Sequence, residues 1–173
     1  MKYKIQIILD EVNKDTKELF MYNDIDIQYF GKTKNIILNT INNNDIVFQS
    51  NDKGNPNAGI IICKSDKNNL KLVGFLKKII KIFEDNFKYL SNTNEKIYEY
   101  SLFSDNSTIN KLLLNENFDI KWELLPKNFI TGKYPSLKKK LNYKILLHHA
   151  TCVSTNDEKI EQMEFVKLNY ITK

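Results

Sequence analysis

Two carboxylates placed two residues apart are the first feature of this chain that could carry chemistry. Asp24 and Asp26 follow a short apolar stretch at residues 19–22, which reads as a strand running out into a loop. Both carboxylates can converge on one hard cation, and aspartate oxygens suit Mg²⁺ or Mn²⁺, which keep positions open for phosphate oxygens. The end of a strand in an open α/β sheet is also where ligands bind. A surface turn explains the same triplet as often as a metal site does.

The histidines offer a third metal ligand. His148 and His149 are adjacent, are the only two in the chain, and end an apolar strand expected at 144–149. A histidine at such a place is more often a hydrogen-bonded core residue, but a neutral imidazole joining two carboxylates forms a mixed site suited to manganese. Lys159, near the start of the next helix, could meet a phosphate together with the free N–H groups of that helix. A solvated surface lysine is an equally good interpretation of Lys159.

Polar residues at two further places are candidates for ligand contact. Asn57 and Gly59 enter an apolar strand, where the glycine allows either close backbone approach to a ligand or simply a tight turn. Asp105 and Asn110 lie at the start of a helix, and Asp105 is either a functional carboxylate or the residue that caps that helix.

The composition limits how an anion could be held. All 26 basic residues are lysine, so a bidentate arginine clamp on phosphate or carboxylate is impossible. Any bound anion must rest on lysine, backbone N–H groups or a metal. The net charge of +5 invites a nucleic-acid hypothesis, but lysines alternate with acidic residues and the longest basic run is 138–140. A mixed, solvated surface is the better interpretation, and no specific nucleic-acid partner is predicted.

Length and apolar content indicate a single domain over residues 1–173 with a sizeable core. Cys63 and Cys152 are too few for a disulfide framework, and we interpret them as buried thiols in a reducing compartment. No apolar run is long enough for a membrane span or a signal peptide, so a cytoplasmic location is predicted.

Hydrophobic periodicity predicts the elements that must position these residues. Helical spacing of apolar residues alternates with short apolar runs, which predicts an α/β layered fold with a mostly parallel sheet flanked by helices. Ser65 is expected to cap the longest helix. The expected helices lie at 5–12, 36–41, 65–90, 104–113 and 157–168, and the strands at 19–22, 45–49, 58–64, 120–124 and 144–149.

Five segments, in order, resemble the metal-dependent GT-A glycosyltransferases, which use nucleotide-diphospho-sugars. Residues 21–30 (MYNDIDIQYF) resemble the DXD motif in its S-D-x-D-x-x-F-F setting. Residues 57–64 (NAGIIICK) resemble the N-x-G-x-x-x-x-K strand, and 105–110 (DNSTIN) resemble D-Q-x-x-x-N. Residues 122–129 are similar to W-x-x-L-P-x-x-F, and 148–159 are similar to the closing H-A-N…G…K element. The resemblance implies a Rossmann-like GT-A fold.

The resemblance also implies a role for each matched residue. Asp24, Asp26 and His149 would hold Mn²⁺ (or Mg²⁺), with Asp24 facing the donor's diphosphate. Lys159 would neutralise phosphate on the departing nucleoside diphosphate. In such a site the metal and one lysine stabilise the developing charge without arginine.

Four matched positions would surround the sugar and the acceptor. They are Asn57, Gly59 and Asn110, with Asp105 as the catalytic residue. The implied partners are a nucleotide-sugar donor and a glycan, protein or small-molecule hydroxyl acceptor.

The chain also departs from the family pattern. Asn106 replaces the glutamine of one motif, Thr151 replaces the asparagine of another, and the glycine before Lys159 is absent. Only about twenty residues precede Asp24, where family members usually carry a βαβ segment that binds the nucleotide base, so an N-terminally shortened fold is expected. Either the chain is a fragment, or the protein lacks part of its donor site and is weak or inactive. The alternative function is that of a catalytically inactive GT-A-derived binding or structural protein.

Overall fold

The fold comes from a computed structural model. It describes residues 2–92, 104–116, 118–132, 144–151, 153 and 155–171. The lysine run at 138–140 and Cys152 lie outside the described residues, so the interpretations placed on them stay predictions.

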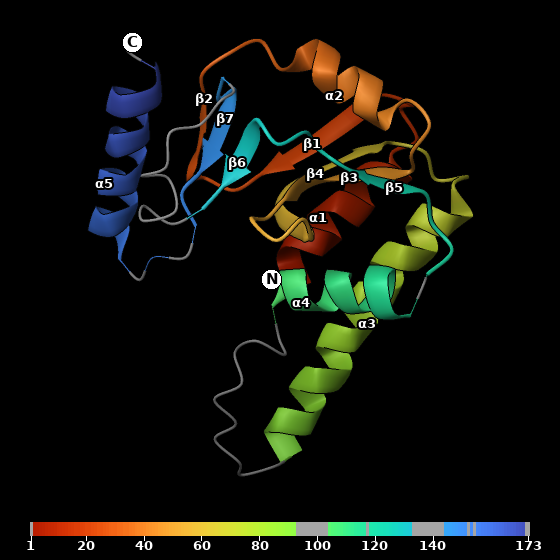
Figure 1. The fold of residues 1–173 in the computed structure, drawn as a ribbon. Coiled ribbons are helices and arrows are strands. Elements are labelled where there is room, and N and C mark those ends of the chain that lie inside the picture. The colour runs from red at the N-terminus through yellow and green to blue at the C-terminus, as the bar shows by residue number, and fades with distance from the viewer. Residues whose placement is uncertain are drawn as a thin grey trace.

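Strands of the described chain form two sheets (Figure 1). Sheet A has the order β1-β4-β3-β5, with β1 at Leu19–Asn23, β4 at Pro56–Lys64, β3 at Ile46–Ser50 and β5 at Trp122–Leu124. Sheet B has the order β2-β7-β6, with β2 at Ile27–Tyr29, β7 at Leu147–His149 and β6 at Phe129–Thr131.

Helices cover these sheets. They are α1 (Lys2–Asn13), α2 (Lys34–Ile41), α3 (Leu70–Asn92), α4 (Asp105–Asn110) and α5 (Asn156–Val166), with π-helical segments η2 (Lys111–Asn115) and η4 (Lys167–Ile171) extending α4 and α5. Figure 1 shows α1, α3 and α4 on one side of sheet A and α2 on the other, while α5 lies beyond sheet B. None of the helices in the described part of the chain is both long and apolar enough to cross a bilayer.

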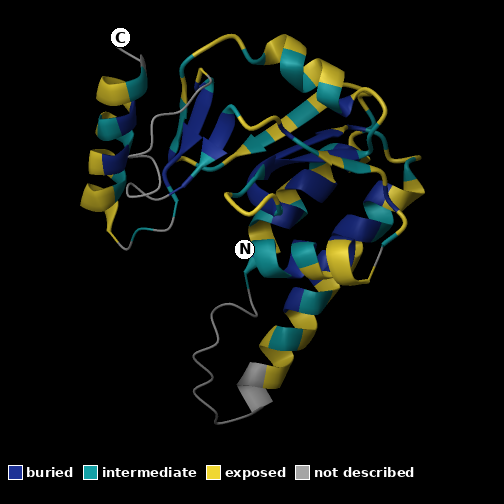
Figure 2. Cartoon of the chain, in the orientation of Figure 1, coloured by how far each residue is buried: buried dark blue, intermediate teal, exposed yellow. Residues whose placement is uncertain are grey.

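Strand β4 lies at the centre of the core, and Figure 2 shows it buried. Ile61 and Cys63 pack with α1 and α3 in one apolar cluster. Ile60 and Ile62 pack on the opposite face with α2 and sheet B. A strand covered on both faces becomes continuously apolar, so the prediction of a doubly buried strand at 58–64 is confirmed.

The α/β layered class is confirmed, but the expectation of a mostly parallel sheet needs correction. β4 pairs antiparallel with both β1 and β3, and β2 pairs antiparallel with β7. Among the strands of the described residues, only the β3–β5 and β6–β7 pairings are parallel. The turn between β3 and β4 is short, and a short turn can join only antiparallel neighbours, whereas parallel strands need a long crossover.

Two local predictions differ from the structure. The Ser65 hydroxyl donates to the carbonyl of Glu11 instead of capping α3. Asn69 caps that helix, because its side-chain oxygen accepts from the N–H of Leu72 at 3.0 Å. The second difference is that β2 and β6, of three residues each, were not predicted.

Candidate functional site

The loop between β1 and β2 holds both aspartates at the edge of sheet A. The N–H of Asp24 continues the β1–β4 ladder by donating to the carbonyl of Gly59 at 2.9 Å. The carbonyl of Asp26 accepts from the N–H of Ala150 at 3.0 Å, which ties the same loop to the end of β7. Ile25 between them is fully exposed, at 100%, while Asp26 is only 8% exposed. The backbone thus turns the two carboxylates inward and the intervening apolar side chain outward.

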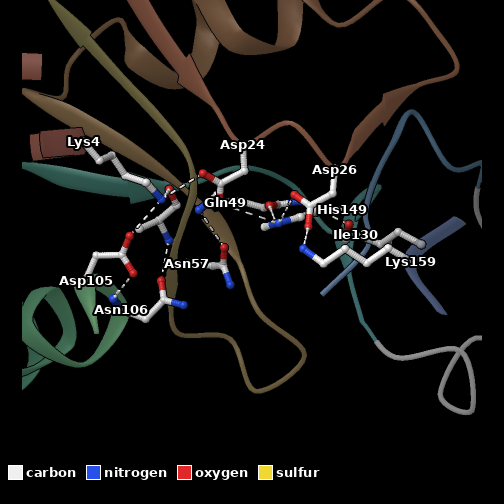
Figure 3. A network of polar contacts seen from close by, with 12 residues as sticks. Lys4, Asp24, Asp26, Gln49, Asn57, Asp105, Asn106, Ile130, His149 and Lys159 are labelled. Carbon is white, nitrogen blue, oxygen red and sulfur yellow. Dashed lines mark hydrogen bonds and ion pairs between the residues drawn. The ribbon is translucent and has the colours of Figure 1, made fainter. Parts of the chain in front are cut away.

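His149 meets both carboxylates from strand β7 (Figure 3). Its Nε2 lies 3.2 Å from Asp26 Oδ1 and 3.8 Å from Asp24 Oδ2. One ligand atom from each of the three residues lies within 4.8 Å of the other two. The pairing of Ile27 with His149 between β2 and β7 brings the histidine to this loop. The predicted trio therefore comes together.

Gln49, at the end of β3, fixes the tautomer of His149. Its amide nitrogen donates to the carbonyls of Phe129 and Ile130, at 3.3 and 3.1 Å. Its amide oxygen therefore faces His149 Nδ1, 3.0 Å away, and accepts the proton that this nitrogen carries. In the neutral ring, Nε2 then presents a lone pair to the two carboxylates.

The electrostatics of this trio favour a bound cation. Burial lowers the pKa of His149, and the carboxylates of Asp26 and Asp24 offset this only in part, so the ring is neutral near pH 7. A lone pair facing two carboxylates is a repulsive arrangement that a cation relieves. Two carboxylate oxygens and one imidazole nitrogen are also a donor set that Mn²⁺ accepts. The residues present thus fit a divalent metal, and Asp24, Asp26 and His149 are the ones that would hold it.

Lys159 reaches the site from the first turn of α5. Its Nζ contacts Asp26 Oδ2 in a close ion pair. Burial opposes ionisation of Asp26, but Lys159 and His149 outweigh it, and the pKa of the Asp26 carboxyl lies below its usual range. A capping box between Thr155 and Glu158 fixes the start of this helix and hence the position of the lysine.

Lys4 is a site residue that sequence reasoning missed. From the first turn of α1, its Nζ lies 2.9 Å from Asp24 Oδ1, 2.8 Å from Asp105 Oδ2 and 3.1 Å from the carbonyl oxygen of Ala58. The ammonium also lies 5.1 Å from the centre of the Tyr22 ring. Burial alone would lower the pKa of Lys4, but Asp105 and Asp24 raise it above its ordinary value. Lys4 therefore stays charged and links the α4 carboxylate to the β1 carboxylate.

Gly59 makes room for the histidine. A Cβ at this position would lie 2.1 Å from His149 Cε1 and 2.3 Å from Nδ1, far closer than atoms can approach. The Asn57 side-chain oxygen accepts from the N–H of Gly59 at 2.8 Å, which shapes the same stretch of β4. Neither a tight turn nor a left-handed backbone is the reason for this glycine.

Helix α4 brings Asp105 and its neighbours to the pocket. Ser104 caps the helix, so the alternative that Asp105 is the cap does not hold. Asn106 accepts from the N–H of Ala58 at 2.6 Å. Asn110 donates to the carbonyl of Pro56 at 3.2 Å, so both amides hold the start of β4.

These residues enclose a polar pocket of about 270 Å³. It is lined by Lys4, Asp24, Asp26, Asn57, Gly59, Asp105, Asn106, His149, Thr151 and Lys159. Of the predicted site residues, Asn110 is outside this lining, and Asp105 is connected to the His149 trio through Lys4, which contacts both Asp105 and Asp24. Gln49, whose side-chain oxygen lies 3.0 Å from His149 Nδ1, was also missed. The one available signal was an amide directly after the apolar run at 46–48.

Comparisons with known proteins agree with this geometry at the level of the fold. No protein-family model matches the chain, and no curated protein matches it either. Two solved structures are similar to it. The glycosyltransferase GlyE of Streptococcus pneumoniae TIGR4 is 16% identical with a TM-score of 0.57, over 95% of this chain and 43% of that one. A glycosyltransferase involved in glycosylation of the major capsid of PBCV-1 is 17% identical with a TM-score of 0.54, over 95% of this chain and 75% of that one.

The chain therefore spans less than half of the first structure and about three quarters of the second. At these identities the likeness concerns the fold. The described chain has a glycosyltransferase-like α/β fold, with its polar pocket where β1 ends, next to Asp24.

Proposed function

We propose that this chain transfers a sugar from a nucleotide-diphospho-sugar donor to a hydroxyl acceptor with the help of Mn²⁺ or Mg²⁺. The observation that carries the proposal is the convergence of Asp24, Asp26 and His149 beside Lys159 in one polar pocket. A glycosyltransferase-like fold supports it.

The metal site is the first part of the proposal. Asp24, Asp26 and His149 would hold the ion, and Gln49 would keep Nε2 of His149 free for it. When bound, a divalent ion supplies positive charge against the diphosphate leaving group. The other roles belong to side chains of this pocket.

Lys159 would bind the diphosphate. It is the most exposed of the cations in the pocket lining, with 35% of its side chain accessible, against 13% for Lys4. A lysine at the mouth of a pocket offers a point charge to phosphate oxygens, in a chain that has no arginine to do so. Its charge would stabilise the nucleoside diphosphate as the bond to the sugar breaks.

Asp105 and the start of β4 would face the sugar and its acceptor. The Asp105 carboxylate lies in the pocket wall, oriented by Lys4, where it can accept hydrogen bonds from hydroxyl groups. Asn57 and the backbone of Gly59 line the adjacent wall. We assign the catalytic role to Asp105, and we expect Asn110 to contribute by holding β4 rather than by touching a ligand.

Calorimetry on the folded protein tests this function. Injection of UDP or GDP with Mn²⁺ should release heat, and the heat should vanish when Mn²⁺ is left out or when Asp24 is changed to alanine. Absence of heat with every nucleoside diphosphate tried would reject the enzyme and favour the alternative, a non-catalytic binding or structural protein of this fold.

A further inference from the structure

Each metal-site carboxylate divides its two oxygens between different partners. Asp24 turns Oδ2 toward His149 and places Oδ1 on the ammonium of Lys4, 2.9 Å away. Asp26 turns Oδ1 toward His149 and places Oδ2 on the ammonium of Lys159. The inner oxygens thus face the position a cation would take, and the outer oxygens are each held by a lysine (Figure 3).

The two lysines nearly cancel the charge of the pocket. Asp24, Asp26 and Asp105 supply three negative charges, Lys4 and Lys159 supply two positive charges, and His149 is neutral. The cluster therefore has a net charge of −1, and a divalent cation would leave it positive. The two ammoniums therefore weaken the attraction that the carboxylates offer to a cation entering alone, whereas an anion entering with the cation offsets the added positive charge.

The two lysines differ in how firmly they are held. Lys4 contacts two carboxylates and the carbonyl of Ala58, and its side chain is 13% exposed. Within the described residues, the Lys159 ammonium contacts Asp26 alone, and its side chain is 35% exposed. Lys4 is therefore a fixed counter-charge, and Lys159 is the one that can exchange partners.

We propose that Lys159 is a positioning residue whose ammonium stays paired with the Asp26 carboxylate until an anion of the diphosphate class binds. The pocket then takes up the metal and the anion together. The proposal rests on the proposed function, because it deepens the role of the same site. Without the anion, the ammonium of Lys159 disfavours the cation at the neighbouring oxygen of Asp26. With the anion, that ammonium moves to the phosphate oxygens and frees the carboxylate for the metal.

The sharpest test measures the binding of Mn²⁺ alone to the full chain. Electron paramagnetic resonance of the free Mn²⁺ reports how much has bound. A fixed charge within about 4–6 Å changes the proton affinity of a carboxylate by about tenfold or more, and a doubly charged ion responds at least as strongly. Lys159→Met should therefore bind Mn²⁺ about tenfold more tightly than the wild type. Damage to the fold would weaken binding, so tighter binding is a result that a merely structural role of Lys159 cannot produce.

Matched controls isolate the charge and its position. Lys78→Met removes the same charge from an exposed site on α3, a helix outside the pocket lining, and should leave Mn²⁺ affinity at the wild-type value. Lys159→Arg keeps the charge and should keep binding weak. Inorganic pyrophosphate at one fixed concentration should raise Mn²⁺ uptake by the wild type more than by Lys159→Met, with metal chelation identical in both samples.

The outcome separates this inference from the proposed function. Suppose that Mn²⁺ with UDP or GDP binds the wild type, but Lys159→Met leaves the affinity for Mn²⁺ alone unchanged or weaker. The proposal that Lys159 exchanges Asp26 for the anion is then wrong, and the proposed function stands. If Lys159→Met tightens Mn²⁺ binding and no nucleoside diphosphate binds, the charge coupling stands and the function is wrong.

Discussion

Two polar hollows lie at opposite ends of strand β4, and the larger one lacks the features of a reactive site. The larger measures about 410 Å³ and is lined by Asn42, Asn43, Asn44, Asp45, Lys64, Asp66, Asn69 and Lys121. The smaller, of about 270 Å³, is the pocket of Asp24, Asp26 and His149.

The difference lies in how their carboxylates are used. In the larger hollow, Asp45 accepts from the side chain of Asn69 at 2.7 Å and from the N–H of Lys121 at 2.9 Å, so it joins the start of β3 to its neighbours. In the smaller pocket, carboxylate oxygens turn toward each other and toward an imidazole lone pair. The proposed function therefore rests on the convergence of donor atoms in the smaller pocket and not on pocket volume.

Removal of one carboxylate of the proposed metal site should have the largest effect on Mn²⁺ affinity, and a small effect would contradict the comparison. Asp26→Asn is expected to lower Mn²⁺ affinity, measured with UDP present, by more than about 100-fold, since even groups outside the ligand shell typically contribute about 10–100-fold. Asp45→Asn makes the same chemical change in the larger hollow and should leave Mn²⁺ affinity unchanged. Equal losses in both variants would contradict the distinction drawn here.

The stability of the fold should depend on pH through His148 on strand β7, which borders the smaller pocket. His148 lies on the opposite face of β7 from His149, and burial lowers its pKa to about 4. The unfolded chain takes up this proton near pH 6.5 and the folded chain only near pH 4, so the unfolded state binds more protons between these values. The free energy of unfolding should therefore fall by about 3 kcal/mol as the pH drops through this window.

Urea titrations at several pH values measure this dependence. His148→Leu should flatten the slope between pH 4 and 6.5. An unchanged slope in that variant would assign the acid sensitivity to other groups.

A methyl group added at residue 59, beside His149, should lower both the stability of the fold and the affinity for Mn²⁺. Gly59→Ala places its Cβ 2.1 Å from His149 Cε1, so the ring must shift from the position in which its Nε2 faces Asp26. We expect a loss of Mn²⁺ affinity together with a destabilisation of about 1–3 kcal/mol. Gly74→Ala, on α3 with open space around its Cβ, is the control, and it should stabilise the protein by about 0.5–1 kcal/mol. Calorimetry and thermal melting on both variants check these values.

The smallest effect is expected in the larger hollow. Asn69→Ala removes the cap of α3 and the amide that holds Asp45, and should cost about 1 kcal/mol of stability. Because no ligand atom of the metal site moves, Mn²⁺ affinity should stay at the wild-type value. A drop in affinity without a drop in stability would show that the two hollows are coupled.

Much of the fold followed from periodicity in the sequence. The helix around Ile5, Ile8 and Val12 and the buried strand around Ile61 were predicted because one-sided and two-sided burial leave different apolar patterns. Strand direction was predicted wrongly, since apolar runs do not encode which neighbour a strand selects. The two neighbours of β4, which are β1 and β3, both run antiparallel to it.

Some residues of the candidate site could be predicted from the sequence and others could not. The gathering of Asp24, Asp26 and His149 was predicted because a metal site demands distinctive residue types, and the structure brings them together. Lys4 could not be found, because it is one of 26 lysines and only the packing of α1 against the sheet turns it inward. The role of Gly59 also depended on a partner about ninety residues away, since only the approach of His149 requires a missing Cβ there.

The pocket joins parts of the chain that are distant in sequence, which has a consequence for folding. Gln49 and His149 are 100 residues apart, and Lys159 and Asp26 are 133 apart. Closing such loops costs chain entropy before any contact forms, and folds dominated by non-local pairings are correspondingly slow. We expect the pocket to form late in folding, after the local helices. A ligand bound there would therefore stabilise fully folded chains selectively. Refolding monitored by Mn²⁺ uptake should be slower than refolding monitored by helix content.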